Sequence, residues 1–248
     1  MRSMFILTIA FAVGYSALWV MGRQDRVAAV AVAEARLVSA GIGVSYDDLR
    51  TRGFPSRHDT RVWGLVLDGE AWRWEVPDLE IASLSYRPGR QIWAFPQRQV
   101  ILIAGRQFEL LADRLRASTR IAADGRVLEV RLEGTDVQSP EGRAGRVFLA
   151  LRLQEETTYD VYLELAEAQI GGNSVQSVRI SGTAILADRL FLDPDLPRPI
   201  SLAVQSGYVD INGKEAELSG SWPNSLELDG PGAADVQTLW GQILGDTR

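Results

Sequence analysis

Few residues in this chain of 248 could carry acid–base or nucleophilic chemistry. The chain has no cysteine and a single histidine, His58, which excludes disulfides, thiolate catalysis, cysteine-ligated zinc and multi-histidine metal sites. A lone histidine acts as a general base only beside a nucleophile or a substrate. We therefore interpret His58, in the segment Arg57-His58-Asp59, as a structural residue that is exposed or lies at an interface.

Catalytic and cofactor-binding motifs are also missing. Residues 172–176 (GNSVQ) lack the second glycine of a G-x-S-x-G nucleophile elbow, and neither a P-loop nor a G-x-G-x-x-G motif occurs. The acidic pair Asp47-Asp48 predicts a turn, and Asp193-x-Asp195 predicts a proline-rich connection rather than a calcium site. We expect no enzyme activity, no cofactor and no metal. The remaining enzyme hypothesis is a glycan hydrolase with two carboxylates across a cleft.

Composition and charge describe a globular protein that does not bind nucleic acid. Hydrophobic residues make up 46% of the chain and charged residues 23%, which is typical of a folded domain. The 26 basic and 32 acidic residues give a net charge of −6, whereas a dedicated nucleic-acid binder shows a basic excess.

The N-terminus carries the strongest signal, an uncharged apolar segment from Met4 to Met21. As a helix its residues would span about 27 Å, close to the hydrocarbon thickness of a bilayer. We predict an uncleaved single-pass signal anchor; the alternatives are a cleaved signal peptide and a buried core helix. The first good cleavage site, Ala31-Val32-Ala33, comes about a dozen residues too late for a signal peptide. The membrane-spanning residues include Met4, Phe5, Ile6, Leu7, Trp19 and Met21.

Beyond the apolar segment the helix should continue as a stalk. Residues 24–40 are rich in alanine and contain no proline or glycine, and Gly41 is a natural end to the helix. We divide the chain into an anchor and stalk at residues 1–41 and a body at residues 42–248. Arginines after the anchor favour a cytoplasmic body, but long domains cross membranes regardless of such charges, and the lack of cysteine suits an oxidising compartment. We expect the body in the periplasm.

The body alternates apolar and polar residues, which is typical of strands with one face buried. In residues 146–153, for example, Val147, Leu149, Leu151 and Leu153 alternate with Arg146 and Arg152. The sequence predicts a mainly β protein, with a curved antiparallel sheet built of hairpins. Residues 107–116 fit either a helix or two short strands. Residues 233–244 predict an amphipathic helix packed on the apolar face of the sheet.

Two local features could contact lipid or a partner protein. The segment Gly53-Phe54-Pro55-Ser56-Arg57 lies among four arginines, which either face anionic head groups or are solvated at a strand-edge turn. A run of aromatic residues follows, and it lines an apolar groove or fills a core. The candidate contact residues are Phe54, Arg57, Trp72, Trp74 and Trp93.

These motifs carry a family resemblance. An anchor, an alanine-rich stalk, Gly-Phe-Pro-x-Arg at residues 53–57 and Trp-x-Val-Pro at residues 74–77 resemble the bacterial envelope family known as domain of unknown function 2125. The late segment from Ser219-Gly220 to Asp229-Gly230 is similar too. The resemblance implies membrane anchoring and export, with no established activity. At the level of fold, the hairpin pattern also resembles AsmA-like envelope proteins that form lipid grooves.

We therefore expect a non-enzymatic protein anchored in the inner membrane, with its body in the periplasm. An apolar sheet face would bind or shield lipid in envelope biogenesis. The alternative is an anchored scaffold that binds another envelope protein.

Overall fold

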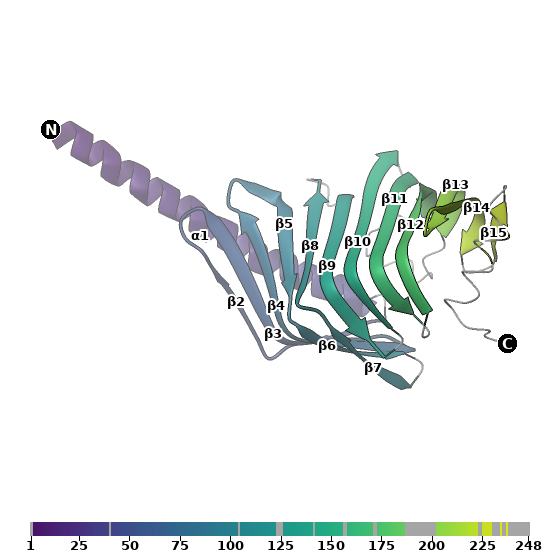
Figure 1. The fold of residues 1–248 in the computed structure, drawn as a ribbon. Coiled ribbons are helices and arrows are strands. Elements are labelled where there is room, and N and C mark those ends of the chain that lie inside the picture. The colour runs from purple at the N-terminus through teal and green to yellow at the C-terminus, as the bar shows by residue number, and fades with distance from the viewer. Residues whose placement is uncertain are drawn as a thin grey trace.

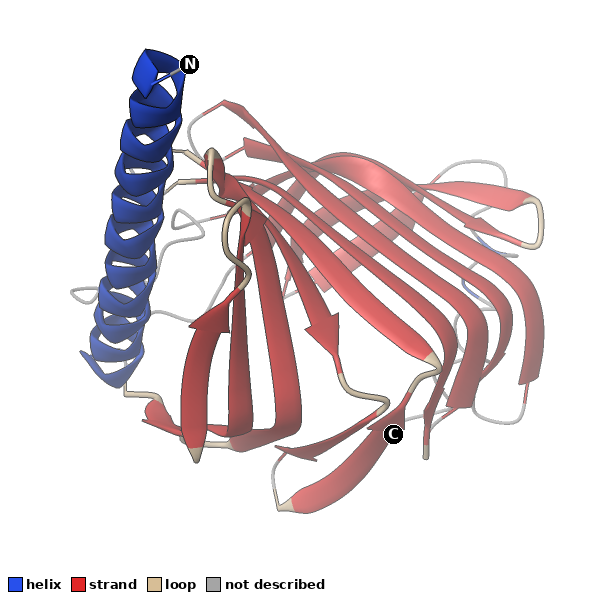
Figure 2. Ribbon diagram, turned by 90° about the vertical axis from the view of Figure 1, so that its left-hand side faces the viewer, coloured by secondary structure: helices blue, strands red, loops and turns tan. Residues whose placement is uncertain are grey.

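The computed structural model describes residues 2–39, 41–103, 105–122, 126–140, 142–155, 158–170, 173–186, 202–222 and 225–229, together with Ala234 and Gln237. These residues form one helix and a large antiparallel sheet (Figures 1 and 2). The elements are α1 (Arg2–Ser39), β1 (Gly43–Ser45), β2 (Asp48–Arg52), β3 (Arg57–Asp68), β4 (Trp72–Leu84), β5 (Arg87–Phe95), β6 (Arg98–Ile103), β7 (Arg106–Leu111), β8 (Arg114–Ile121), β9 (Val127–Ser139), β10 (Gly142–Glu155), β11 (Thr158–Ile170), β12 (Asn173–Leu186), β13 (Leu202–Ile211), β14 (Lys214–Trp222) and β15 (Ser225–Asp229).

The long N-terminal helix that the sequence predicts is confirmed, and Gly41 caps its C-terminal end as expected. The Gly41 amide donates to the Val38 carbonyl at 3.0 Å, and the Ile42 amide donates to the Leu37 carbonyl at 2.9 Å. This pair of bonds is a Schellman cap, which needs a left-handed residue, and Gly41 has φ +79°. The cap turns the chain back into β1 (Figure 2).

Among the described residues, no helix is both long enough and apolar enough to cross a membrane.

The sheet is an antiparallel meander, so the hairpins expected from the sequence are confirmed. Its strands follow the order β1-β3-β4-β5-β8-β9-β10-β11-β12-β13-β14-β15. The other three strands, β2, β6 and β7, pair beside strands of this series. β1 and β2 pair with β3 in one continuous register, and β6 and β5 pair with successive parts of β4. The segment 107–116, for which a helix was the alternative, lies in β7 and β8 with the turn between them.

A crease crosses the sheet and bends its strands (Figure 1). Two long strands break there, between β5 and β6 and between β7 and β8, and the Ala112 amide donates to the Gln97 carbonyl across the two breaks at 2.9 Å. Beside these breaks Asp136 in β9 has φ +49°, and two strands farther along the sheet Glu167 in β11 has φ +53°. At the other end of the crease Gly64 has φ +62°, and a Cβ there would lie 2.1 Å from the Asp47 carboxylate. Isolated left-handed residues and bulges bend strands, so the crease gives the sheet an inside and an outside.

The inner face of the sheet carries an apolar row from β4 to β14. One row of residues that pair directly across neighbouring strands runs from β4 to β14: Ile81, Trp93, Ala117, Leu132, Leu149, Leu163, Ile180, Val209 and Ala216. The adjacent row on the outer face contains Arg131, Tyr162, Ser181 and Glu217. Strand alternation therefore sorts the side chains as the sequence predicts.

The amphipathic helix predicted at residues 233–244 lies outside the described residues apart from Ala234 and Gln237, which are both helical. Among the elements of the described residues α1 is the only helix, so no C-terminal helix is seen on the sheet.

Candidate functional site

The helix docks on the sheet through the Gly-Phe-Pro-x-Arg segment and His58. The indole of Trp19 stacks on the imidazole of His58 with 5.4 Å between ring centroids and meets the Phe54 ring edge-on at 5.5 Å. Its Nε1–H donates to the Arg57 carbonyl oxygen at 2.9 Å. Gly22 lies one turn farther along α1, where a Cβ would come within 3.1 Å of the His58 ring. The motif that carries the family resemblance therefore forms a seat for the helix.

His58 is a buried interfacial residue, which agrees with its interpretation from the sequence. It is 3% exposed, and its Nε2 lies 3.4 Å from the Trp19 carbonyl oxygen. Its Nδ1 is buried and has no hydrogen-bond partner among the described residues. A ring that is stacked and enclosed in this way cannot reach a substrate for proton transfer.

A second contact between α1 and the body lies near the C-terminal end of the helix. The Tyr46 hydroxyl, in the turn between β1 and β2, donates to the Glu34 carboxylate at 3.3 Å. The Glu34 charge, followed by a small loss of solvation, raises the pKa of Tyr46 above its usual value, so the phenol stays neutral and can donate. The helix is therefore held to the first strands at two positions, Trp19 and Glu34.

Aromatic residues fill the crease between β3 and β6. Val62 and Leu79 from one side of the crease pack with Val76 and Trp74 from the other. The Trp74 Nε1–H donates to Gln99 Oε1 at 3.0 Å, and Gln99 is 1% exposed. This cluster closes the inside of the bend at the N-terminal end of the sheet.

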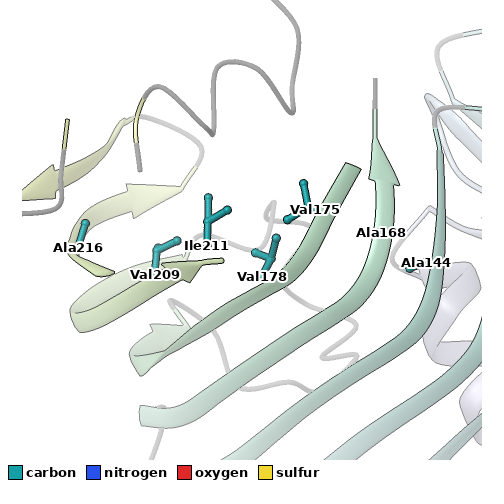
Figure 3. Close-up of a cluster of buried hydrophobic side chains, with 7 residues drawn as sticks. All are labelled: Ala144, Ala168, Val175, Val178, Val209, Ile211 and Ala216. Atoms are coloured by element: carbon teal, nitrogen blue, oxygen red, sulfur yellow. The ribbon is translucent and has the colours of Figure 1, made fainter. Parts of the chain in front are cut away.

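A second buried cluster lies at the other end of the sheet. It joins β10 to β14 through Ala144, Ala168, Val175, Val178, Val209, Ile211 and Ala216. Figure 3 shows Val175, Val178 and Ile211 on the inside of the bent strands. Both ends of the inner face are therefore packed.

Between the two clusters the inner face of β9, β10 and β11 is only partly covered, except at Tyr159 in β11, which is 2% exposed. None of its leucines and valines reaches the burial of the two clusters, and all stay partly accessible. They are Leu128, Val130, Leu132, Leu149, Leu151, Leu153, Val161 and Leu163, while Val147 and Leu165 pack against the second cluster. An ordinary core would bury these side chains. We call this partly accessible stretch the apolar trough.

The candidate residues from the sequence fall into three places. Phe54 and Arg57 lie together at the helix seat, and Trp74 and Trp93 both face the inner side near the crease. Trp93 donates its Nε1–H to Thr119 Oγ1 at 3.2 Å. Trp72 lies apart from both groups, 36% exposed at the far end of β4.

The acidic pairs show no metal-binding arrangement where they are described. Asp48 forms an ion pair with Arg50 at 2.7 Å and accepts the Leu49 amide at 2.9 Å. Asp193 and Asp195 lie outside the described residues. The residues that sequence reasoning did not select are the trough leucines, although their alternation in the sequence marked them as one face.

Comparison with known proteins places the chain in a family but does not supply an activity. A family model described as "Uncharacterized protein conserved in bacteria (DUF2125)" matches residues 19–230, so the chain belongs to this family. No curated protein and no solved structure matches the chain. The fold-level similarity to AsmA-like proteins is therefore not confirmed. The match begins at Trp19, the residue that seats the helix.

Proposed function

We propose that this member of the family is a non-enzymatic, membrane-anchored periplasmic protein that binds or shields a lipid chain in its apolar trough. The observation that carries the proposal is the partly exposed inner face of β9, β10 and β11, between two buried clusters. Transfer of one methylene from water to an apolar surface stabilises by about 0.8 kcal/mol, so an acyl chain gains from such a surface along its whole length.

The sequence supports a membrane anchor in the first half of the helix. Residues from Met4 to Met21 are uncharged and mostly apolar, and the segment ends within the helix that docks at Trp19. The N-terminal part of α1 projects past the sheet (Figure 1). If this part lies in the bilayer, the seat at Phe54 and Arg57 lies at its surface. The trough then opens close to a source of lipid.

Photocrosslinking tests this proposal on the full chain in cell membranes. The photoreactive residue p-benzoylphenylalanine would replace Leu149, which faces the trough, or Phe148, which faces outward on the same strand. After irradiation, mass spectrometry of the purified chain would identify the adducts. We expect lipid adducts at position 149 and few at position 148, because adjacent strand residues point to opposite faces.

Equal labelling at the two positions, or no lipid at position 149, would refute lipid binding in the trough. Capture of a single reproducible protein at position 149 would support the scaffold alternative instead.

A further inference from the structure

A cavity of about 680 Å³ lies at the ends of the strands near the helix seat. It is formed where β3 begins, β4 ends, β5 begins, β8 ends and β9 begins. Its charged lining comes from Arg57, Arg90, Arg120, Arg131 and Glu129. The strand pairing places these residues on the outer face of the sheet, away from the trough.

The lining carries more positive than negative charge. Glu129 is its one carboxylate, and it contacts two arginines: Arg131 at 2.5 Å and the Nε of Arg120 at 3.7 Å. The Arg120 Nε atom is buried and has no hydrogen-bond partner among the described residues. Arg57 is paired with Asp59 at 3.0 Å. A single glutamate therefore does not neutralise the positive charge of the cavity lining.

Among these arginines, Arg90 is the one whose charge is least neutralised. It lies directly opposite Arg120 on the neighbouring strand, and no hydrogen bond or ion pair joins its guanidinium group to any residue that the structure describes. Like charges directly opposite each other destabilise a sheet unless an anion lies between them. Both arginines line the same cavity, and arginine binds the oxygens of a phosphate with paired hydrogen bonds.

The surroundings of the cavity are those of a membrane interface. Large apolar side chains are exposed around it: Phe54 is 56% exposed, Leu84 37%, Tyr86 66% and Ile92 53%. Leu84 and Ile92 line the cavity, and Tyr86 lies in the turn between β4 and β5. Arg57 joins the cavity to the helix seat, since its carbonyl accepts the Trp19 indole. Basic residues beside exposed aromatic and aliphatic side chains favour contact with anionic lipid.

We propose that this cavity binds a phosphate group, through Arg90 and Arg120 with help from Arg131 and Arg57. The source is either a phospholipid head group at the membrane surface or a free phosphate ion. Only the head-group source rests on the anchoring proposed above. The charge excess and the strand pairing stand without it.

Phosphorus NMR on the full chain in non-ionic detergent tests the proposal. The two probes are inorganic phosphate and short-chain dihexanoyl phosphatidylglycerol, titrated at low and high salt. We expect both to bind and salt to weaken them. The double variant Arg90→Gln/Arg120→Gln should bind at least about tenfold more weakly, because it loses charge-assisted hydrogen bonds. Arg143→Gln is the matched control, an exposed strand arginine in β10 that pairs with the far end of β9 from the cavity.

The outcomes separate the two sources. Tighter binding of phosphatidylglycerol identifies a head-group site, and equal binding identifies a phosphate-ion site. Equal affinity of the double variant and the control, or no binding to the native chain, would overturn the proposal. If the double variant fails to fold, Arg90→Gln alone and the charge-keeping Arg90→Lys take its place. Inorganic phosphate has no acyl chain, so this result is independent of lipid binding in the trough.

Discussion

Replacing Trp19 by alanine should release the helix from its seat. The substitution removes a hydrogen bond to the Arg57 carbonyl and two ring contacts, with His58 and Phe54. A hydrogen bond contributes about 1 kcal/mol and each aromatic pair about 0.5–1.5 kcal/mol, so the seat loses about 2–4 kcal/mol. Because 1.4 kcal/mol changes an equilibrium constant tenfold, the ratio of docked to undocked helix should fall by roughly 30- to 1000-fold.

The single histidine provides the assay. His58 gives the only imidazole signals in an untagged chain, and the stacked indole shifts them by its ring current. In Trp19→Ala these signals should move to the positions of a solvent-exposed histidine. Val20→Ala is the control, since Val20 is the next helix residue and is 47% exposed. Unchanged His58 signals in Trp19→Ala would refute the claim that Trp19 seats the helix.

Three further predictions concern the crease and the second helix contact. Gly64→Ala should lower the free energy of unfolding by about 1–2 kcal/mol, because an alanine at φ +62° is strained, and chemical denaturation would measure the loss. Unchanged stability would contradict the bend at this position. Gln99→Met should cost about 1–3 kcal/mol by leaving the partly buried Trp74 N–H without an acceptor, and adding Trp74→Phe should recover most of it. A double-mutant cycle with no coupling would refute this pairing. The raised pKa of Tyr46 means that its contact with Glu34 persists through neutral pH and is lost as the pH rises through that pKa. In an absorbance titration, the variant Glu34→Gln should therefore lower the pKa of one tyrosine. Identical titration curves for the variant and the native chain would contradict the contact.

Much of the fold follows from local patterns. Alternation predicted the strands because one side of every strand faces the inside of the sheet, and Gly41 marked the end of the helix because its cap needs a left-handed residue. The crease was not predictable. Asp136 and Glu167 take left-handed conformations, which their residue types do not require.

The sites depend on pairing between distant strands, which a single sequence does not reveal. Arg90 and Arg120 meet because β5 pairs with β8, thirty positions apart in sequence at that point. In the same way, the basic segment around Arg57 reads as a solvated turn, and its second role as a seat for Trp19 appears only when the helix is in place. Leu149 and Leu163 were each recognisable as apolar strand residues, but their partial exposure depends on the bend of the whole sheet.

The most direct test of the central proposal is native mass spectrometry of the full chain, extracted from membranes into a mild non-ionic detergent without added lipid. Lipid binding in the trough predicts a population heavier by the mass of a lipid, which Leu149→Asn with Leu163→Asn should remove and Phe148→Asn should retain. A chain that carries only its own mass, or a lipid adduct that all three forms retain equally, would contradict the proposal.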